Sequence, residues 1–257
     1  MGGVPVLEAA ARFGPYFVWQ PRDDEPGWRP LTDLLDPAVA AERVAAGQRV
    51  LRRMSGLGPD QLGERVVAST IFLGLASRLV SPLLATAALT GVVPAADPAR
   101  LWWRPVEGGP LPLSYREMGV TDESLHRVAI GRLVAPLLEV FQRHFVLSPQ
   151  VLWGNVASAL GGAAGMIADA GDPVAAERSA ALVAELLAVP PLLGTATLHR
   201  PDQRHARWFL ERHNCCLYYR IPGGGTCGDC VLTPDDQRRR QWRAVLNRRS
   251  GAESTGD

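Results

Sequence analysis

The stretch that decides the fold is residues 66–96, VVASTIFLGLASRLVSPLLATAALTGVVPAA, the most membrane-like part of the chain. A membrane-spanning helix needs about 20 apolar residues without a central charge. Here Arg78 lies near the middle, and Pro82, Gly91 and Pro94 interrupt the apolar run. We therefore predict a pair of buried helices in a soluble protein.

Signals for further helices occur on both sides of this stretch. A polar N-cap acceptor followed by a proline favours the first turn of a helix. The chain has this pattern at Asp36-Pro37, Ser148-Pro149, Asp172-Pro173 and Thr233-Pro234. Helical spacing also begins at Thr121 and near residue 60, and we predict a short helix over residues 203–212.

Residues 101–113, LWWRPVEGGPLPL, are rich in aromatic residues, proline and glycine, which predicts a short hairpin or an extended loop. The fold class is therefore mainly α (α+β at most), with a few short strands. We expect a helical domain over residues 1–200. A C-terminal segment, residues 201–257, would hold a final helix and a disordered tail from residue 250.

Composition narrows the functional classes. The 257 residues are 47% hydrophobic and carry a net charge of +1, with no lysine. A nearly neutral chain is a poor candidate for a nucleic-acid binder that relies on global positive charge. The N-terminus lacks the basic and apolar regions of a secretory signal. We expect a cytoplasmic protein whose thiols stay reduced.

All four cysteines fall within a short segment, as Cys215, Cys216, Cys227 and Cys230. Scattered structural thiols would not gather in this way, and disulfides would be out of place in the cytoplasm. An adjacent pair is also a poor disulfide, since neighbouring side chains diverge. The remaining interpretations are a structural zinc site and an iron–sulfur cluster.

The spacing favours the cluster over zinc but leaves both open. Cys227 and Cys230 form a C-x2-C knuckle of the kind that zinc uses, but adjacent cysteines chelate one small ion poorly. A 2Fe-2S cluster spreads four thiolates over two irons, although this spacing matches neither common ferredoxin pattern. Four cysteines suffice, so we expect a structural or surface role for His213.

The glycines around the cysteines suit a bulky group. Gly223, Gly224, Gly225 and Gly228 let the backbone approach it and point N–H groups at sulfur. Arg220 lies between the two cysteine pairs, where it would stabilise a negative cluster. A plain turn and a surface ion pair are the structural alternatives.

The cysteine segment resembles a known family. CCLYYRIPGGGTCGDCVL, residues 215–232, is similar to the C-terminal motif of FhuF-type ferric-siderophore reductases, in which adjacent cysteines are followed ten residues on by C-x2-C. ASRLVSPLLA (76–85) and LWGNVASAL (152–160) resemble the same family more weakly. The histidine and asparagine before the cysteine pair depart from the usual short polar residue, which would tune the cluster.

The resemblance implies an FhuF-like helical domain and a 2Fe-2S cluster held by Cys215, Cys216, Cys227 and Cys230. It implies a cytoplasmic enzyme, at most peripherally associated with the membrane, that reduces ferric siderophores of the hydroxamate or catecholate type. A ferredoxin or an NAD(P)H-dependent reductase would donate the electron. No catalytic residue is expected beyond the cluster, with Gly224, Gly225, Gly228 and Arg220 around it.

The sequence does not identify the residues that bind the chelate. Trp102, Trp103, Trp153 and Asn155 are candidates, although packing is the more common role of such residues. The arginines of the last helix suit either an acidic electron donor or a solvated helix end. Three other functions remain: a zinc-stabilised helical scaffold, a cluster-based electron carrier or sensor, and a helical domain of siderophore biosynthesis.

Overall fold

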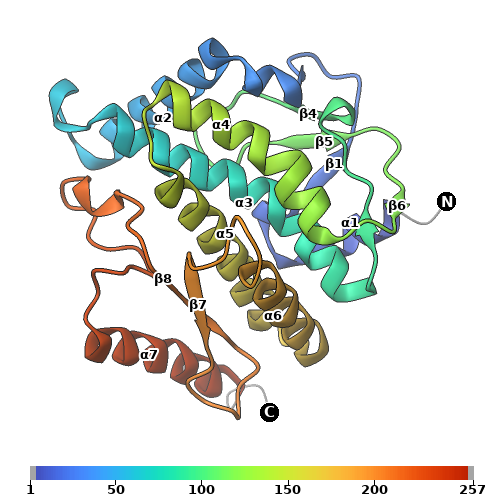
Figure 1. Ribbon diagram of the computed structural model, residues 1–257, viewed down its shortest axis with the longest axis vertical. Helices are drawn as coiled ribbons and strands as arrows, with labels where there is room; N and C mark the ends of the chain where they lie inside the picture. The colour runs from blue at the N-terminus through green and yellow to red at the C-terminus, as the bar shows by residue number, and fades with distance from the viewer. Residues whose placement is uncertain (1–3, 254–257) are drawn as a thin grey trace.

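The computed structural model describes residues 4–253 as a helical body with three small sheets (Figure 1). The α-helices are α1 (Val4–Ala10), α2 (Pro37–Ser55), α3 (Glu64–Thr90), α4 (Ala135–His144), α5 (Pro149–Asp169), α6 (Pro173–Leu187) and α7 (Asp235–Glu253). The strands are β1 (Trp19–Pro21), β2 (Arg29–Pro30), β3 (Val93–Pro94), β4 (Leu101–Trp103), β5 (Leu113–Tyr115), β6 (Val120–Thr121), β7 (Ala196–His199) and β8 (Phe209–Arg212). The predicted mainly α class is confirmed.

Helix α3 lies at the centre of the fold and packs most extensively against α5 (Figure 1). The prediction of two helices over residues 66–96 is wrong, because one helix continues past Pro82 to Thr90. Proline removes one helical hydrogen bond, but buried side chains on both sides of Pro82 hold the helix against its neighbours. The helix ends at Gly91, whose φ of +75° few other residues adopt readily.

Arg78 is the charge that interrupts the apolar stretch, and the fold satisfies it with backbone carbonyls. Its guanidinium donates to Leu111 O at 2.6 Å, Pro15 O at 2.6 Å and Val18 O at 2.5 Å. Burial lowers the pKa of Arg78 to about 10. Three carbonyl acceptors replace the lost water, so this arginine ties α3 to two loops.

The predicted N-caps at Asp36, Ser148 and Asp172 are confirmed, whereas the cap at Thr233 stays a prediction. The side chains of Asp36, Ser148 and Asp172 accept hydrogen bonds from backbone N–H groups at the starts of α2, α5 and α6. Helix α7 begins directly after Thr233-Pro234. Its helical backbone continues to Glu253, and the disordered tail stays a prediction. The rest of the predicted tail, residues 254–257, lies outside the described residues.

The largest sheet has the strand order β1-β5-β4-β2 and covers one side of the helical body. Strands β4 and β5 pair antiparallel, which confirms the hairpin predicted over residues 101–113. The helix expected from Thr121 begins only at His126, as a π-helix that runs to Val134 and leads into α4. Residues 120 and 121 instead pair with β3.

Strands β7 and β8 form an antiparallel hairpin, so the short helix predicted over residues 203–212 is wrong. Tertiary contacts decide this: Phe209 stacks on Trp242 of α7 with ring centroids 5.3 Å apart, while Leu210 faces α5. The predicted division at residue 200 falls in the connecting loop between these paired strands. The division itself stays a prediction.

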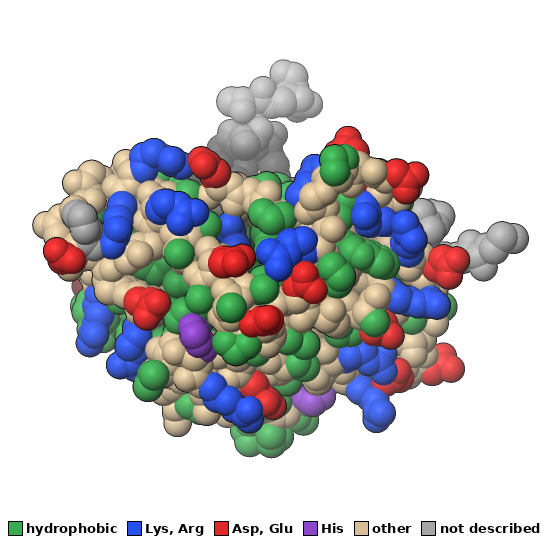
Figure 2. Space-filling view, turned by 90° about the horizontal axis from the view of Figure 1, so that it is seen from above, with side chains coloured by type: hydrophobic (Ala, Val, Ile, Leu, Met, Phe, Trp, Pro, Cys, Tyr) green, Lys and Arg blue, Asp and Glu red, His purple; other side chains and the backbone are tan. Residues whose placement is uncertain are grey.

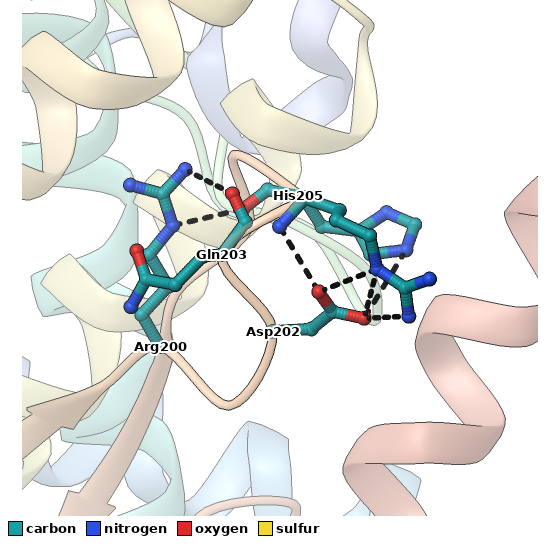
Figure 3. A network of polar contacts seen from close by, with 5 residues as sticks. Arg200, Asp202, Gln203 and His205 are labelled. Atoms are coloured by element: carbon teal, nitrogen blue, oxygen red, sulfur yellow. Dashed lines mark hydrogen bonds and ion pairs between the residues drawn. The ribbon is translucent and has the colours of Figure 1, made fainter.

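Polar contacts within the loop between β7 and β8 fix its shape (Figure 3). Arg200 donates to His205 O at 3.0 Å and to Gln203 O at 3.3 Å. Arg204 pairs with Asp202 at 2.7 Å, and this contact holds the pKa of Asp202 well below its usual range. Arg200 also pairs with Glu177 of α6 at 2.8 Å, which anchors the loop to the helical body.

Two helices, α3 and α5, are long and apolar enough to cross a membrane by composition alone. In the fold, 72% and 67% of their most apolar windows are buried inside the protein, as in the core helices of a soluble domain.

Figure 2 shows one face of the molecule, on which acidic and basic side chains are interspersed and neither sign gathers.

Candidate metal centre

The cysteine segment follows β8 directly and leads into α7 (Figure 1). Cys230 N donates to Cys227 O at 3.2 Å, which closes a tight turn around the C-x2-C pair. Arg212 N donates to Asp229 O at 3.2 Å, which brings this turn beside the end of β8. The two cysteine pairs, separated in sequence, are thereby brought to one place.

The thiols are free and near one another. Cys216 Sγ lies 3.4 Å from Cys227 Sγ, so one cysteine of each pair is in contact. Cys215 Sγ accepts a hydrogen bond from Leu217 N at 3.3 Å, and Cys230 Sγ accepts one from Leu232 N at 3.4 Å. Across residues 4–253, no three His, Cys, Asp or Glu side chains form a group that would hold a metal ion as they stand.

The contact between Cys216 and Cys227 separates their proton affinities. The hydrogen bond between the two thiols lowers the pKa of Cys216 to about 6 against the effect of burial. The same hydrogen bond, together with burial and the nearby Asp229, raises the pKa of Cys227 far above its usual range. The contact therefore favours the thiolate form of Cys216, and the thiolate is the form that binds metal.

Arg212 is a buried positive charge beside these thiols. The residue is 0% exposed, and its Nε donates to Asn214 O at 2.8 Å. Its Nη2 donates to Asn155 Oδ1 at 2.9 Å and to Asn214 Oδ1 at 3.1 Å, while Nη1 has no hydrogen-bond partner. The guanidinium charge also acts to lower the pKa of both Cys215 and Cys216, although burial raises the pKa of Cys215 overall.

A chain of buried hydrogen bonds connects the cysteine segment to the two core helices. Asn155 of α5 donates to Ser69 O and Ser69 Oγ, each at 3.0 Å. Ser69 of α3 donates in turn to Cys216 O at 2.8 Å. Because Asn155 also accepts from Arg212, a single buried side chain fixes both the arginine and the Cys216 backbone.

Glycines on one face of α5 let the C-terminal part approach closely. A Cβ at Gly154 would lie 1.8 Å from Asn214 Oδ1 and 2.8 Å from Arg212 Nη2. A Cβ at Gly161 would lie 2.7 Å from Leu210. The backbone of α5 is therefore in direct contact with β8 and with the residues just before Cys215.

The residues predicted to lie around the cluster differ from one another in their contacts and exposure. Gly225 has a φ of +68°, so the turn requires a left-handed residue there. Gly224 N donates to Ile221 O at 2.8 Å, so this N–H belongs to the turn. A Cβ at Gly228 would meet open space. Arg220 is exposed, and its guanidinium lies over the Tyr219 ring at 5.7 Å. Their role toward a cluster stays a prediction.

His213 has the structural role that the sequence suggests. Its backbone N–H donates to Thr195 O at 2.9 Å, and its ring nitrogens lie 3.0 Å from Gly194 O and 2.9 Å from Thr197 Oγ1. These contacts hold the exposed ring against the strand β7 and the turn before it. The cysteine pair therefore begins from an anchored position.

Of the tryptophans considered for chelate binding, two lie in the largest sheet and the third, Trp153, lies in α5 next to Gly154. Trp102 and Trp103 are in β4, where Trp103 Nε1 donates to Pro30 O at 3.1 Å. Of the four candidates, Asn155 is the one that contacts the cysteine segment. Sequence reasoning missed Arg212, Ser69 and Gly154. The signal in the sequence that could have pointed to these residues was Asn155, a polar residue within an apolar helix.

The donor set fits a thiolate-ligated group of negative charge. The thiols of Cys216 and Cys227 are in contact, the sulfurs of Cys215 and Cys230 each accept a backbone N–H group, and the buried guanidinium of Arg212 keeps one nitrogen without a partner. Hydrogen bonds and positive charge of this kind compensate the negative charge of an iron–sulfur cluster. Fold and site thus define a helical protein with a cysteine-rich metal-binding segment.

Comparison with known families identifies that segment. Residues 212–232 match the FhuF 2Fe-2S C-terminal domain, so this segment is similar to that family of iron–sulfur domains. The match spans Arg212 and all four cysteines, and it indicates a 2Fe-2S cluster as the cofactor. No curated protein matches the chain.

Proposed function

We propose that this protein is a ferric-siderophore reductase in which Cys215, Cys216, Cys227 and Cys230 hold a 2Fe-2S cluster. The supporting observation is that all four cysteines lie within the matched 2Fe-2S domain, beside the buried cation Arg212. When bound, the cluster supplies one-electron chemistry, which a zinc site does not.

The chemistry of the substrate explains why one electron releases the metal. Siderophores bind iron through hard oxygen donors, which prefer iron(III) to iron(II). Each tenfold preference for iron(III) lowers the potential of the complex by about 59 mV. A hydroxamate or catecholate chelate therefore needs a low-potential donor, and iron(II) leaves it readily.

The residues of the chain have defined tasks in this proposal. Ser69 and Asn155 fix the backbone of Cys216, and the Cys227–Cys230 turn fixes the second pair. Arg212 compensates negative charge that would otherwise be poorly solvated in a buried site. No side chain is needed as a general acid or base, because the chemical step is the transfer of an electron.

The setting of the reaction follows from the same proposal. Reduced thiols suit the cytoplasm, with at most peripheral contact with a membrane. A ferredoxin or an NAD(P)H-dependent reductase would supply the electron. Arg239 and Arg243 are exposed on α7 and would attract an acidic donor protein.

The test begins with anaerobically purified protein and its visible spectrum before and after dithionite. We expect absorption that bleaches on reduction, two irons and two acid-labile sulfides per chain, and loss of all three in Cys227→Ser. Reduced protein should then release iron(II) from a ferric tris-hydroxamate or tris-catecholate, measured with a ferrous-specific trap. A protein that stays colourless after iron–sulfur reconstitution, and that contains stoichiometric zinc, would refute the proposal in favour of a zinc-stabilised scaffold. A protein that holds the cluster but releases no iron(II) from either chelate would instead be an electron carrier or a sensor.

A further inference from the structure

A cleft of ≈ 360 Å³ lies between α5, β8 and α7. Its lining includes Gly162 of α5, Trp208 and Phe209, Cys227 in the cysteine segment, and Gln241 and Trp242 of α7. Clefts that open to solvent and combine aromatic walls with a few polar groups are typical ligand sites. This cleft therefore has the form of a binding site, and a cysteine forms part of its wall.

The position of Cys227 distinguishes this cleft from the other large ones. Cys227 is only partly buried, and Gly228 and Asp229 beside it also line the cleft. A second cleft, of ≈ 240 Å³ between α2 and α3, has no residue of the 212–232 segment in its lining. A ligand in the first cleft would lie directly against one of the four proposed iron ligands, which is the placement that electron transfer requires.

Two residues of the cleft wall, Arg207 and Trp208, each carry a hydrogen-bond donor that has no partner in the protein and lies beneath the surface of the cleft. Trp208 Nε1 and Arg207 Nε are buried atoms without a hydrogen-bond partner. Such donors are normally paired in a folded protein, so each one calls for an acceptor. The carbon chains of an iron chelate in the cleft would pack on the Phe209–Trp242 stack.

The walls of the cleft are held in place before any ligand arrives. Arg207 donates to Gly165 O at 2.7 Å and forms an ion pair with Asp169 of α5. The guanidinium of Arg200, anchored in the loop of Figure 3, lies 5.8 Å from the centre of the Trp208 ring. A preformed wall lowers the entropic cost of binding.

We propose that this cleft receives the ferric chelate and that the electron reaches the chelate on the Cys227 side of the cluster. This inference rests on the proposed function. In the transfer, the reduced protein loses one electron and iron(III) gains it; no covalent bond is made. The iron(II)–oxygen bonds then break as the metal leaves the chelate, and the electron donor restores the reduced protein.

Two glycine variants test the assignment. A Cβ at Gly162 meets no atom within 4 Å, so Gly162→Phe would fill the cleft without disturbing the fold. Gly74 of α3 lines the cleft between α2 and α3 and also has open space, so Gly74→Phe is the matched control. Trp208→Phe keeps an aromatic ring but removes the N–H donor.

The probes are gallium(III) complexes of a tris-hydroxamate and a tris-catecholate, which resemble the ferric chelates but are not reduced. Isothermal titration of the cluster-loaded protein gives their dissociation constants. For the chelate that wild-type protein binds, we expect at least tenfold weaker binding in Gly162→Phe, weaker binding in Trp208→Phe, and wild-type binding in Gly74→Phe. The visible spectra of all variants should match that of wild-type protein, and KM for the ferric chelate should rise in Gly162→Phe.

The outcomes separate this inference from the proposed function. Wild-type binding of the gallium chelate in Gly162→Phe, or loss of binding in Gly74→Phe, overturns the assignment of the cleft. Reduction of ferric chelates by a protein that binds neither gallium chelate also overturns it and leaves the reductase proposal intact. Binding that depends on Gly162, with no reduction of any ferric chelate, supports the cleft and refutes the reductase.

Discussion

The close contact between α5 and the cysteine segment can be measured with two alanine substitutions in the same helix. Gly154→Ala places a methyl group 1.8 Å from Asn214 Oδ1, whereas Gly162→Ala places one in open space. Both substitutions remove a helical glycine, so both carry the same intrinsic gain of about 1 kcal/mol in helix stability. Their difference isolates the contact at Gly154.

The size of that difference follows from the hydrogen bonds. Asn214 must turn away from the new methyl group, and it then loses the bond from Arg212 Nη2 at 3.1 Å. A hydrogen bond to a charged group contributes about 1.5–3 kcal/mol. We therefore expect Gly162→Ala to raise the free energy of unfolding by about 1 kcal/mol and Gly154→Ala to lower it by about 0.5–2 kcal/mol.

The assay is urea unfolding of the reduced, cluster-free protein, followed by circular dichroism. If the free energy of unfolding falls with urea concentration at the same slope in all variants, the substitutions change the stability and not the surface exposed on unfolding. Because Asn214 directly precedes Cys215, Gly154→Ala should also bind less iron and less acid-labile sulfide on reconstitution. Two alanine variants with equal stability and equal cluster content would refute the claim that this contact positions the cysteines.

Three further predictions concern charge, protonation and packing. Arg212→Gln removes a buried cation that favours the more negative reduced state, so the cluster potential should fall by on the order of 60 mV, a tenfold change, in a potentiometric titration; an unchanged potential would argue against this role. In metal-free protein, alkylation of Cys216 should rise with pH around a midpoint near 6, because its pKa is lowered to about 6; Cys227→Ala should return the midpoint toward the ordinary thiol value of about 8.5. Trp242→Ala removes the stack on Phe209 and should cost about 3–5 kcal/mol, with faster proteolysis of α7 than of the helical body; equal proteolysis of both parts would contradict it.

Much of the helical framework could be predicted because its signals are local. N-caps at Asp36, Ser148 and Asp172 depend on side chains that accept from backbone N–H groups only two or three residues away. The hairpin predicted over residues 101–113 depends on the composition of a few neighbouring positions. The predicted helix over residues 203–212 failed because pairing with β7 and the Phe209–Trp242 stack are contacts with distant residues.

The features of the candidate site also divide into local ones, which could be predicted from the sequence, and long-range ones, which could not. The four cysteines and their glycine-rich turn are adjacent in the chain, so their chemistry could be read from spacing and resemblance. Arg212 was not singled out, because an arginine near a cysteine pair is ordinary until its burial is known. Ser69 lies far away in sequence and reaches Cys216 O only after α3 and α5 have packed.

The sequence by itself determined a mainly helical protein with a thiolate segment suited to a 2Fe-2S cluster. Residue types, helix caps and short-range spacing carry that information. Only the tertiary structure decided which charge faces the thiols, which helix holds the cysteine backbone, and where a cleft meets Cys227. These features depend on close packing between segments that are distant in the chain, and burial and long-range hydrogen bonds leave no local pattern in the sequence.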